Sequence, residues 1–276
     1  MPNKTLAPNE YRAFAEFLNK KSGIELGDNK QYLVRSRLAP LLVKYRCNTM
    51  AELVKQVLAS DAPALHTEVV EAMTTNETFW FRDGYPFELF KEQLLPELAK
   101  QKRRPRVWSA ACSTGQEPYS LAMALQEFRQ RNPGKLTLPP EIIATDLDTK
   151  VLSQAQTGSY DSLAMARGLS PERSRQFFDS QPDGKHQVNQ ATRSLVSFRR
   201  LNLFDSYALL GKFDVIYCRN VLIYFSADSK RQILRQFAAA LNPGGYLMLG
   251  ASESMAQLSD EFEMLRFPSG IVYRKR

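Results

Sequence analysis

The sequence has few of the residues that carry metal-dependent and nucleophilic chemistry. It contains only two histidines, His66 and His186, and neither has a second histidine or a cysteine at the spacing of a metal-binding motif. We therefore expect no metal ion. The sequence also contains no Gly-x-Ser-x-Gly motif, which argues against a hydrolase with a serine nucleophile.

Cysteines and long apolar segments are also scarce. Cys47, Cys112 and Cys218 are odd in number and far apart, which predicts free thiols in a reducing cytoplasm rather than disulfides. No run of about 18 apolar residues could span a bilayer, and the first residues lack the apolar stretch of a secretory signal. We expect a cytoplasmic protein with no membrane insertion.

Basic residues exceed acidic ones. The chain has 37 Lys and Arg against 29 Asp and Glu, a formal net charge of +8 and a pI near 9.4. This balance favours an acidic partner, which could be nucleic acid, an anionic membrane or an acidic protein.

The segment from Arg106 to Ser120 predicts a buried strand, a tight loop and a helix, the arrangement that holds nucleotide-like cofactors. Gly115 is expected to let the backbone approach a ligand. The loop has no other glycine, so it does not match the dinucleotide pattern Gly-x-Gly-x-x-Gly. Glu117 would repel a pyrophosphate at the start of the helix, but it suits a cofactor without phosphate.

The chain divides into a helical part and an alternating part. Residues 1–75 predict an all-α N-terminal domain, with Tyr11, Phe14, Ala15 and Leu18 on one apolar stripe. Residues 76–90 are interpreted as a linker, and residues 91–276 as an α/β domain. Its expected strands are 107–111, 142–145, 195–201, 213–218 and 246–250, and its expected helices are 118–131, 149–156 and 227–241.

Two further features distinguish the α/β domain. Residues 262–267 and 271–274 predict an antiparallel hairpin, which is typical of class I methyltransferases, Rossmann-like proteins with a mainly parallel sheet. Between about 158 and 196 the alternation pauses over a polar stretch with a Pro-Asp-Gly turn signal. This stretch predicts a small inserted subdomain.

The segment from Gln31 to Met50 carries basic residues and no acidic ones. An unbroken helix would place Arg35 with Arg46, and Arg37 with Lys44, on common faces. Pro40 would either kink that helix or start a second one. The segment is either a solvated basic face or a docking surface for an acidic helix.

Polar residues follow the expected strands at the sheet edge where ligands bind. Asp146 can accept both ribose hydroxyls of an adenosine, whereas Asp148 is interpreted as the N-cap of the next helix. The other candidates are Asn202, Leu203, Arg219 and Asn220. An amide can read the adenine edge and a leucine can pack on its face, although each asparagine could instead cap a turn.

Cys218 raises the possibility of a cytosine methyltransferase, but the proline that normally precedes such a cysteine is replaced by Tyr217. The residues after Asn220 likewise lack the Pro-Pro-aromatic run of adenine N6 methyltransferases. Tyr224 lies one helical turn beyond Asn220 and is either a rim residue of the site or a half-buried packing tyrosine.

Over essentially its whole length the sequence resembles the CheR family of chemoreceptor glutamate O-methyltransferases. The resemblance rests on the helical N-terminal region and on these motifs in family order: Asn76-Glu-Thr-Phe-Trp-Phe-Arg82, Ser109-Ala-Ala-Cys-Ser-Thr-Gly-Gln-Glu-Pro-Tyr-Ser120, Thr145-Asp-Leu-Asp148, Asn202-Leu203 and Cys218-Arg-Asn-Val-Leu-Ile-Tyr-Phe225. It implies S-adenosylmethionine as cofactor and S-adenosylhomocysteine as product. The implied cofactor contacts are Asn76, Thr78, Arg82, Glu117, Asp146, Asn202, Leu203, Arg219 and Asn220.

The resemblance also implies a function and a partner. The protein would methylate glutamates in the cytoplasmic helical bundle of a chemoreceptor, and Arg35, Arg37, Lys44 and Arg46 would dock on it. Arg82 and Tyr224 are the residues expected to assist catalysis by orientation. The stretch around 181–187 is short for members that hold a receptor C-terminal tether, so we expect a tether-independent monomer.

The sequence leaves three alternatives open. A nucleic-acid or other protein methyltransferase would fit the high pI, although we expect no nucleic-acid binding. A non-catalytic signalling adaptor could keep the cofactor pocket. A nicotinamide oxidoreductase is disfavoured by the loop with a single glycine.

Overall fold

The apolar stripe of the N-terminal region forms the core of a four-helix unit. Tyr11, Phe14 and Leu18 are buried on α1 (Pro8–Ser22), which ends at Gly23 in the left-handed conformation with φ 71°. The unit also contains α2 (Gln31–Lys44), α3 (Met50–Ala59) and α4 (Pro63–Met73). The computed structural model describes residues 6–59, 61–101, 103–136 and 138–276. Its described residues up to Thr75, together with Tyr224–Ser229, form the smaller of two compact units.

The basic segment differs from the expectation. α2 runs continuously from Gln31 to Lys44 with Pro40 inside it, so Pro40 does not start a second helix. The helix ends before Arg46, which has a positive φ of 54°. The expectation that Arg35 and Arg46 share one face of an unbroken helix is therefore wrong, because the left-handed turn at Arg46 takes the chain out of the helical path.

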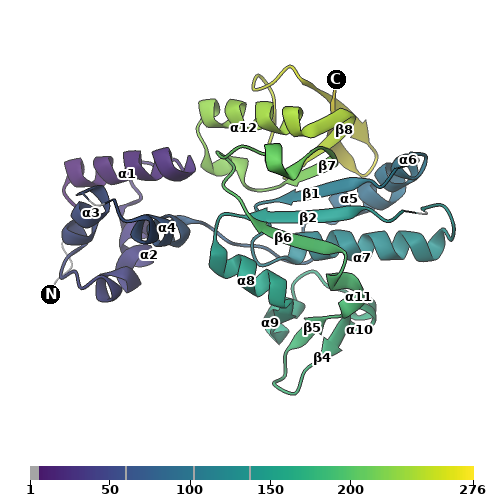
Figure 1. The fold of residues 1–276 in the computed structure, drawn as a ribbon, viewed down its shortest axis with the longest axis horizontal. Helices are drawn as coiled ribbons and strands as arrows, with labels where there is room; N and C mark the ends of the chain where they lie inside the picture. The colour runs from purple at the N-terminus through teal and green to yellow at the C-terminus, as the bar shows by residue number, and fades with distance from the viewer. Residues whose placement is uncertain (1–5, 60, 102, 137) are drawn as a thin grey trace. The chain divides into compact units, whose positions relative to one another are not determined.

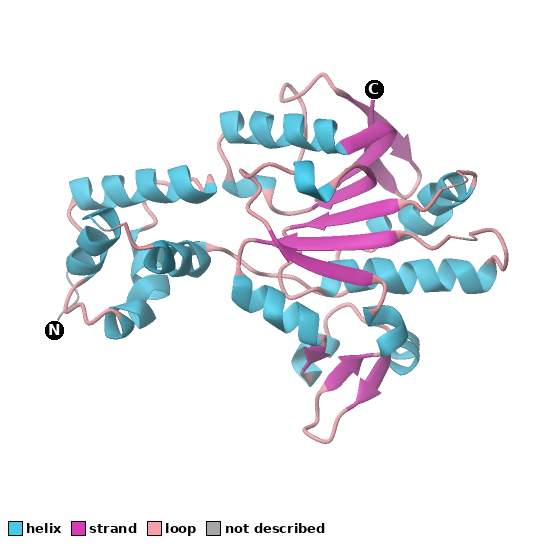
Figure 2. Cartoon of the chain, in the orientation of Figure 1, coloured by secondary structure: helices cyan, strands magenta, loops and turns pink. Residues whose placement is uncertain are grey.

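The larger unit is built on a seven-stranded sheet in the order β6-β2-β1-β7-β8-β10-β9 (Figures 1 and 2). The pairs from β6 to β8 are parallel, and β10 pairs antiparallel with both β8 and β9. The strands are β1 (Arg106–Ala110), β2 (Glu141–Asp146), β6 (Val196–Arg200), β7 (Phe213–Cys218), β8 (Leu241–Leu249), β9 (Phe262–Phe267) and β10 (Gly270–Lys275). The predicted parallel sheet with a C-terminal antiparallel hairpin is confirmed.

The strand β8 begins earlier than expected. The Asn-Pro-Gly-Gly run after α12 (Ala227–Ala240) falls within its bounds, although the pairing with β7 shifts there. Phe213 pairs with Leu241, and the next paired residues are Val215 and Tyr246. The predicted turn is thus present as an irregular start of the strand.

The central strands are buried on both faces, as expected for parallel strands covered by helices on each side. Val107 belongs to the core that includes Leu121 and Leu125 of α7 (Gln116–Arg131). The next residue, Trp108, faces the other way and packs against Phe237 of α12, with ring centroids 5.3 Å apart. This alternation fixes the register of the sheet.

The segment expected as a linker belongs to the larger unit and contributes to its core. Trp80 and Phe87 are fully buried, and Phe81 is 7% exposed. The chain then forms three short helical pieces, namely α5 (Tyr85–Leu89), the π-helix η1 (Phe90–Leu94) and α6 (Leu95–Ala99). The interpretation of this aromatic cluster as core is confirmed for Trp80 and Phe81.

The insertion after α8 (Thr149–Thr157) forms a second, three-stranded sheet in the order β3-β5-β4 (Figure 2). Its elements are β3 (Ser159–Tyr160), α9 (Ser162–Met165), α10 (Pro171–Phe177), β4 (Phe178–Ser180), β5 (His186–Val188) and α11 (Gln190–Arg193). Two 3₁₀ turns complete the fold, η2 (Ala208–Leu210) and η3 (Leu222–Tyr224). The predicted β-subdomain is confirmed.

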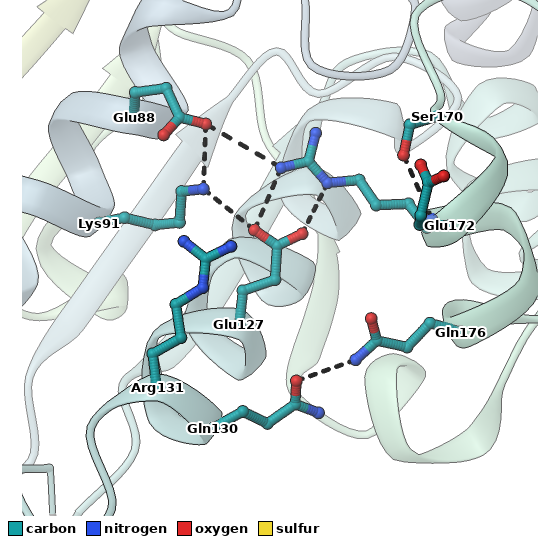
Figure 3. Close-up of a pocket in the computed structure, with 9 residues that line it drawn as sticks. Glu88, Lys91, Glu127, Gln130, Arg131, Ser170, Glu172 and Gln176 are labelled. Atoms are coloured by element: carbon teal, nitrogen blue, oxygen red, sulfur yellow. Dashed lines mark hydrogen bonds and ion pairs between the residues drawn. The ribbon is translucent and has the colours of Figure 1, made fainter.

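Ion pairs fasten the insertion to the rest of the unit beside a pocket of about 470 Å³. Lys91 and Glu127 point toward one another across it (Figure 3), 3.0 Å apart. Arg173 of α10 pairs with the same Glu127 at 2.6 Å and lies 3.6 Å over the ring of Phe81. The insertion, α7 and the segment after Asn76 therefore share one charged cluster. No helix among the described residues is long and apolar enough to cross a membrane.

Candidate functional site

The order of strands places a ligand-binding crevice beside β1. From β1 the chain moves outward through β2 and β6 on one side, and through β7 and β8 on the other. Ligands of open α/β sheets bind outside the carboxyl ends of the strands where this order reverses. The residues that follow β1, β2 and β7 meet at this point.

The loop between β1 and α7 is held in a sparsely populated conformation. Ala111 and Ser113 have positive φ values of 56° and 51°, each costing about 1–2 kcal/mol for a residue other than glycine. The loop is tied to β2 by the backbone N–H of Cys112, which donates to the carbonyl of Thr145 at 2.9 Å. Strain of this kind concentrates at functional sites.

Gly115 has a packing role in addition to the one expected. A side chain there would meet Cβ of Ala155 at 2.9 Å and the hydroxyl of Tyr160 at 3.1 Å, and its φ of 95° is left-handed. Tyr160 also donates a hydrogen bond to the carbonyl of Thr114 at 2.7 Å. The space beside Gly115 is thus filled by the protein itself, so packing alone already requires glycine at this position; the approach of its backbone to a ligand stays a prediction.

Asp146 ends β2 as a buried residue that is 5% exposed. One oxygen accepts the backbone N–H of Ser113 at 2.8 Å and the other that of Asp148 at 2.9 Å. Burial raises the pKa of Asp146 to about 6, against the lowering effect of the backbone N–H groups of Asp148, Ser113 and Leu147. A carboxylate offers about four acceptor positions, so acceptor capacity remains for a hydroxyl group of a ligand.

Asn76 joins the start of the larger unit to this edge. Its side-chain amide donates to Oδ2 of Asp148 at 2.8 Å, and its carbonyl accepts the hydroxyl of Ser113 at 2.8 Å. Oδ1 of Asp148 accepts the backbone N–H groups of Lys150 and Val151, which confirms Asp148 as the N-cap of α8. Asn76 therefore lies beside the β1 loop, as its assignment to the site requires.

Glu117 and Arg219 meet across the crevice. Arg219, with its side chain 1% exposed, lies 3.3 Å from Glu117 and 2.6 Å from Asp83, and Ser109 donates to Glu117 at 2.7 Å. Burial raises the pKa of Glu117 above its ordinary value, and Arg219 and Ser109 counteract it. When ionised, the two carboxylates and one guanidinium carry a net charge of −1, which suits a cationic ligand.

Two buried polar atoms beside this cluster have no hydrogen-bond partner among the described residues. They are Nε of Arg219 and Oδ1 of Asn220, whose φ is 58°. Buried polar groups are nearly always satisfied in folded proteins. A donor and an acceptor left over at the carboxyl edge fit a polar cofactor.

Arg82 is half-buried on the face of Phe79, with the guanidinium carbon 5.3 Å from the ring centroid. It donates one bond to the carbonyl of Glu77 at 3.2 Å, which leaves further N–H groups for a ligand. Arg167 lies over the same ring at 5.1 Å. Thr78, next to Phe79, is half-buried.

The residues after β6 form a turn. The side chain of Asn202 accepts the backbone N–H of Phe204 at 3.1 Å, and its carbonyl accepts that of Asp205 at 2.9 Å. This agrees with the turn-capping interpretation. Leu203 is 7% exposed, and its carbonyl accepts the hydroxyl of Tyr207 at 2.6 Å.

The remaining predicted residues belong to the smaller unit. Tyr224 is half-buried and its carbonyl accepts the backbone N–H of Glu25 at 2.9 Å. Arg37 donates to the carbonyls of Met73 and Thr74 at 2.5 and 2.7 Å, at the C-terminal end of α4. The guanidinium of Arg37 therefore has a structural role within this unit.

The other basic residues of this segment are more exposed. Lys44 pairs with Glu68 at 2.6 Å. Arg35 and Arg46 are both exposed at the surface.

Sequence reasoning missed Asp83 and Ser109 as partners of Arg219 and Glu117. Ser109 lies within the β1 motif and Asp83 directly follows Arg82, so adjacency to the motifs was the available signal. Cys218 is fully buried, and burial raises the pKa of its thiol well above the ordinary value. This environment disfavours a thiolate nucleophile at Cys218 and the cytosine-methyltransferase interpretation with it.

The parallel sheet with antiparallel C-terminal strands and this acidic carboxyl edge are those of an S-adenosylmethionine-dependent methyltransferase. Residues 76–271 match the family "CheR methyltransferase, SAM binding domain" and residues 9–74 match "CheR methyltransferase, all-alpha domain". The chain belongs to the CheR methyltransferase family.

Full-length relatives agree. The chain is 53% identical over 270 residues to chemotaxis protein methyltransferase 1 of Vibrio cholerae serotype O1, covering 98% of each chain. It is 52% identical over 269 residues to chemotaxis protein methyltransferase 1 of Pseudomonas aeruginosa, covering 97% of this chain and 98% of that one. Identity to the chemotaxis protein methyltransferase of Salmonella typhimurium is 34% over 267 residues, covering 94% and 88%.

Proposed function

We propose that the protein methylates specific glutamate side chains in the cytoplasmic domain of chemoreceptors, the methyl-accepting chemotaxis proteins. S-adenosylmethionine supplies an electrophilic methyl group on a sulfonium, and the products are glutamate γ-methyl esters and S-adenosylhomocysteine. The names of the full-length relatives, chemotaxis protein methyltransferases, support this role in chemotactic adaptation.

The observation that carries the choice of acceptor is that, among the described residues, neither a histidine nor an activated thiol lies at the carboxyl edge, while its carboxylates Asp146 and Glu117 are assigned to the cofactor. Burial raises the pKa of both nearby thiols, Cys112 and Cys218, well above their ordinary values. The two histidines lie elsewhere, His66 on α4 and His186 on β5. A glutamate acceptor needs no base, because with an ordinary pKa of about 4.3 it is already a carboxylate at neutral pH.

The reaction would be an in-line attack by a glutamate oxygen on the methyl group, with opposite charges partly neutralised in the transition state. A dry site favours this step, because water stabilises the separated charges more than the dispersed ones. Positioning of the two reactants would supply the remaining reduction of the activation barrier. Intramolecular reactions show that positioning can lower a barrier by about 7–11 kcal/mol.

Each end of the cofactor has a chemical counterpart among the site residues. Asp146 would accept the ribose hydroxyls, and Glu117 would accept from the cationic amino group. Arg82 would pair with the carboxylate of the methionine half. The remaining proposed contacts are Asn76, Thr78, Asn202, Leu203, Arg219 and Asn220.

Arg82 and Tyr224 would also orient the acceptor glutamate. A guanidinium that gripped the nucleophile tightly would lower its reactivity, so the main role of Arg82 is assigned to the cofactor and its role toward the substrate is secondary. The hydroxyl of Tyr224 would donate to the acceptor carboxylate or shape the methyl passage. Full activity of Tyr224→Phe would exclude the role of the hydroxyl.

The basic residues of the smaller unit would dock on the acidic helical bundle of the receptor. Exposed Arg35 and Arg46 are the best placed, and exposed Lys44 can exchange Glu68 for an acidic partner. Arg37 would contribute mainly by holding α2 to α4.

We further propose that recognition is independent of a receptor C-terminal tether. The β4–β5 hairpin closes tightly, since Gln181 donates its backbone N–H to the carbonyl of Lys185 at 2.8 Å. Measurable affinity for an aromatic C-terminal receptor peptide would overturn this. We also propose that the protein is a cytoplasmic monomer. Sedimentation at working concentration would measure its mass and so test the monomeric state.

The test of the function is transfer of a labelled methyl group to a receptor cytoplasmic fragment. We expect label to enter the fragment as a base-labile ester and to disappear when the acceptor glutamates are changed to Gln. Labelling that persists after the acceptor glutamates are changed to Gln, or a labelled product that is stable to base, would contradict glutamate methylation. Retention of RNA at moderate salt, with methylation of the RNA, would support the nucleic-acid alternative that the basic pI allows.

A further inference from the structure

One carboxylate, that of Glu253, collects four backbone N–H groups at the carboxyl ends of β7 and β8. Oε2 accepts from Asn220 and Gly250, each at 2.7 Å. Oε1 accepts from Val221 at 2.9 Å and from Ile223 at 3.3 Å. The acceptor capacity of the carboxylate is therefore fully used by main-chain donors.

These bonds hold the turn that carries Arg219 and Asn220. Asn220 has a left-handed φ of 58°, which a residue other than glycine adopts only at a cost. Its backbone N–H is fixed by one of the two shortest bonds to Glu253. Hydrogen bonds to an ionised acceptor are about twice as strong as neutral ones, so this carboxylate can keep the turn in a conformation it would otherwise leave.

Gly250 closes the arrangement from β8. A Cβ at this position would come within 2.8 Å of Oε2 of Glu253 and 2.9 Å of both the backbone nitrogen and Nδ2 of Asn220. Any side chain there must displace either the carboxylate or the asparagine. Gly250, Glu253 and Asn220 are thus mutually dependent in their positions.

The turn faces the groups assigned to the cofactor. Arg219 contacts Glu117 at 3.3 Å, and the unpartnered buried atoms, Nε of Arg219 and Oδ1 of Asn220, belong to this turn. If the turn relaxed, the direction of both side chains would change. Glu253 itself contacts main-chain atoms of this turn, so it acts on a ligand through Arg219 and Asn220.

We propose that Glu253 is a positioning residue for cofactor binding, which fixes the Arg219–Asn220 turn through its four backbone bonds and whose place requires glycine at position 250. The inference rests on the proposed assignment of Arg219 and Asn220 to the cofactor site. It does not depend on which substrate receives the methyl group.

The test compares Glu253→Gln with a matched variant, Glu141→Gln. Glutamine has nearly the same shape, but its NH₂ group would face backbone N–H donors, so two of the four bonds are replaced by donor–donor contacts. Glu141 lies at the amino end of β2 and pairs with Arg106 at 2.8 Å, so its replacement removes a carboxylate contact on the opposite edge of the sheet. Affinity for S-adenosylhomocysteine is measured by calorimetry, and stability of the ligand-free protein by thermal unfolding.

We expect Glu253→Gln to weaken cofactor affinity by about tenfold or more, and Glu141→Gln to leave it unchanged. The rate of methyl transfer at saturating cofactor should fall less than the rate at low cofactor, which a loss of fold alone would not produce. Wild-type affinity in folded Glu253→Gln would overturn the proposal.

Two further variants keep the test decisive if Glu253→Gln does not fold. Gly250→Ala keeps the carboxylate and pushes on it, and should weaken affinity in the same way. Glu253→Asp keeps the charge on a shorter side chain and should recover part of the affinity. Unchanged affinity in both would overturn the proposal. Wild-type protein that binds cofactor but does not label a receptor fragment would contradict the proposed function alone.

Discussion

Glu117 and Arg219 lie 3.3 Å apart, from carboxylate Oε2 to guanidinium Nη1, where the first turn of α7 meets the residue that follows β7. The second terminal nitrogen of Arg219 pairs with Asp83 at 2.6 Å. Arg219 therefore does not depend on Glu117 alone for charge compensation. The carboxylate of Glu117 remains available to a cationic ligand group.

We predict that Glu117→Gln weakens binding of S-adenosylhomocysteine by about tenfold to a hundredfold, because a charge-assisted bond to the cofactor's ammonium group is lost. The fold should persist, since Arg219 keeps Asp83 and Ser109 can donate to the amide oxygen. Calorimetric titration measures the affinity, and thermal unfolding checks the fold.

The same variant should bind 5′-methylthioadenosine with wild-type affinity, because this analogue lacks the amino-acid half. An equal loss for both ligands would place Glu117 away from the amino end of the cofactor.

Asp146 predicts a pH dependence of cofactor affinity. Burial raises its pKa to about 6, so the carboxylate that accepts ribose hydroxyls becomes protonated as the pH falls through that value. Affinity for 5′-methylthioadenosine should therefore be constant above about pH 7 and fall below pH 6, by up to about tenfold per pH unit. The stability of the ligand-free protein should change in the opposite sense. Because the pKa of Asp146 is higher in the folded than in the unfolded protein, the free energy of unfolding should fall as the pH rises from 3.8 to about 6.

The control for this prediction is Asp146→Asn. It should bind the analogue weakly at every pH and show a flat profile between pH 5 and pH 8. A profile that keeps its step in Asp146→Asn would assign the titration to another group.

The central sheet can be predicted from the sequence because its strands are short apolar runs between turn signals. Residues 213–218 are buried at every position and match their predicted bounds. The strands of the insertion are two or three residues long, too short to show a period, so only the turn signals and polar composition indicated a subdomain there. The π-helix η1 likewise has no signal in residue pattern.

The site can be predicted in part, because an acid that follows a parallel strand must lie at the ligand-binding edge. Asp146 follows from this rule. The contact between Arg219 and Asp83 joins residues 136 positions apart, and no local pattern reports such a pair. The packing that requires glycine at position 115 has no local signal either, since its neighbours Ala155 and Tyr160 come from later elements.

Arg82→Ala should weaken cofactor affinity strongly while leaving the fold intact. The guanidinium is half-buried and makes one bond to the carbonyl of Glu77, so its removal exposes little core. Arg167→Ala is the matched control, because Arg167 lies over the same Phe79 ring and pairs with Glu77. Unchanged affinity of Arg82→Ala with a collapsed turnover would instead assign Arg82 to the acceptor glutamate.

Arg35→Ala and Arg37→Ala should separate docking from stability. Arg37 satisfies two carbonyls and the Thr75 hydroxyl, so its loss should cost about 1–3 kcal/mol of unfolding free energy. Arg35 is exposed, and its loss should leave unfolding unchanged while weakening methylation of a receptor fragment most at low salt. Equal effects of the two variants on unfolding would contradict this division.

The ion pairs of Glu127 should make the free energy of unfolding depend on pH in the acid range. Burial opposes ionisation of Glu127, but hydrogen bonds from Arg173 and Lys91 outweigh it and hold its pKa below the ordinary value. Its stabilising contribution is therefore present above about pH 4.5 and is lost as the pH falls through the depressed folded pKa.

Glu127→Gln should lower the unfolding free energy at pH 7 by about 3 kcal/mol, the lower end for a broken buried pair, because Glu88 still lies 3.0 Å from Lys91. The variant should also lose less stability than wild type on acidification, as measured by urea unfolding between pH 3 and pH 7. Glu172→Gln is the control, since its pair with Arg175 is exposed to solvent and should contribute little to stability. The double variant Glu127→Gln with Arg173→Gln should be more stable than the sum of the single losses, because neither partner is then left as an unpaired charge. Additive losses, or a Glu127→Gln variant as stable as Glu172→Gln, would show that this cluster does not fasten the insertion.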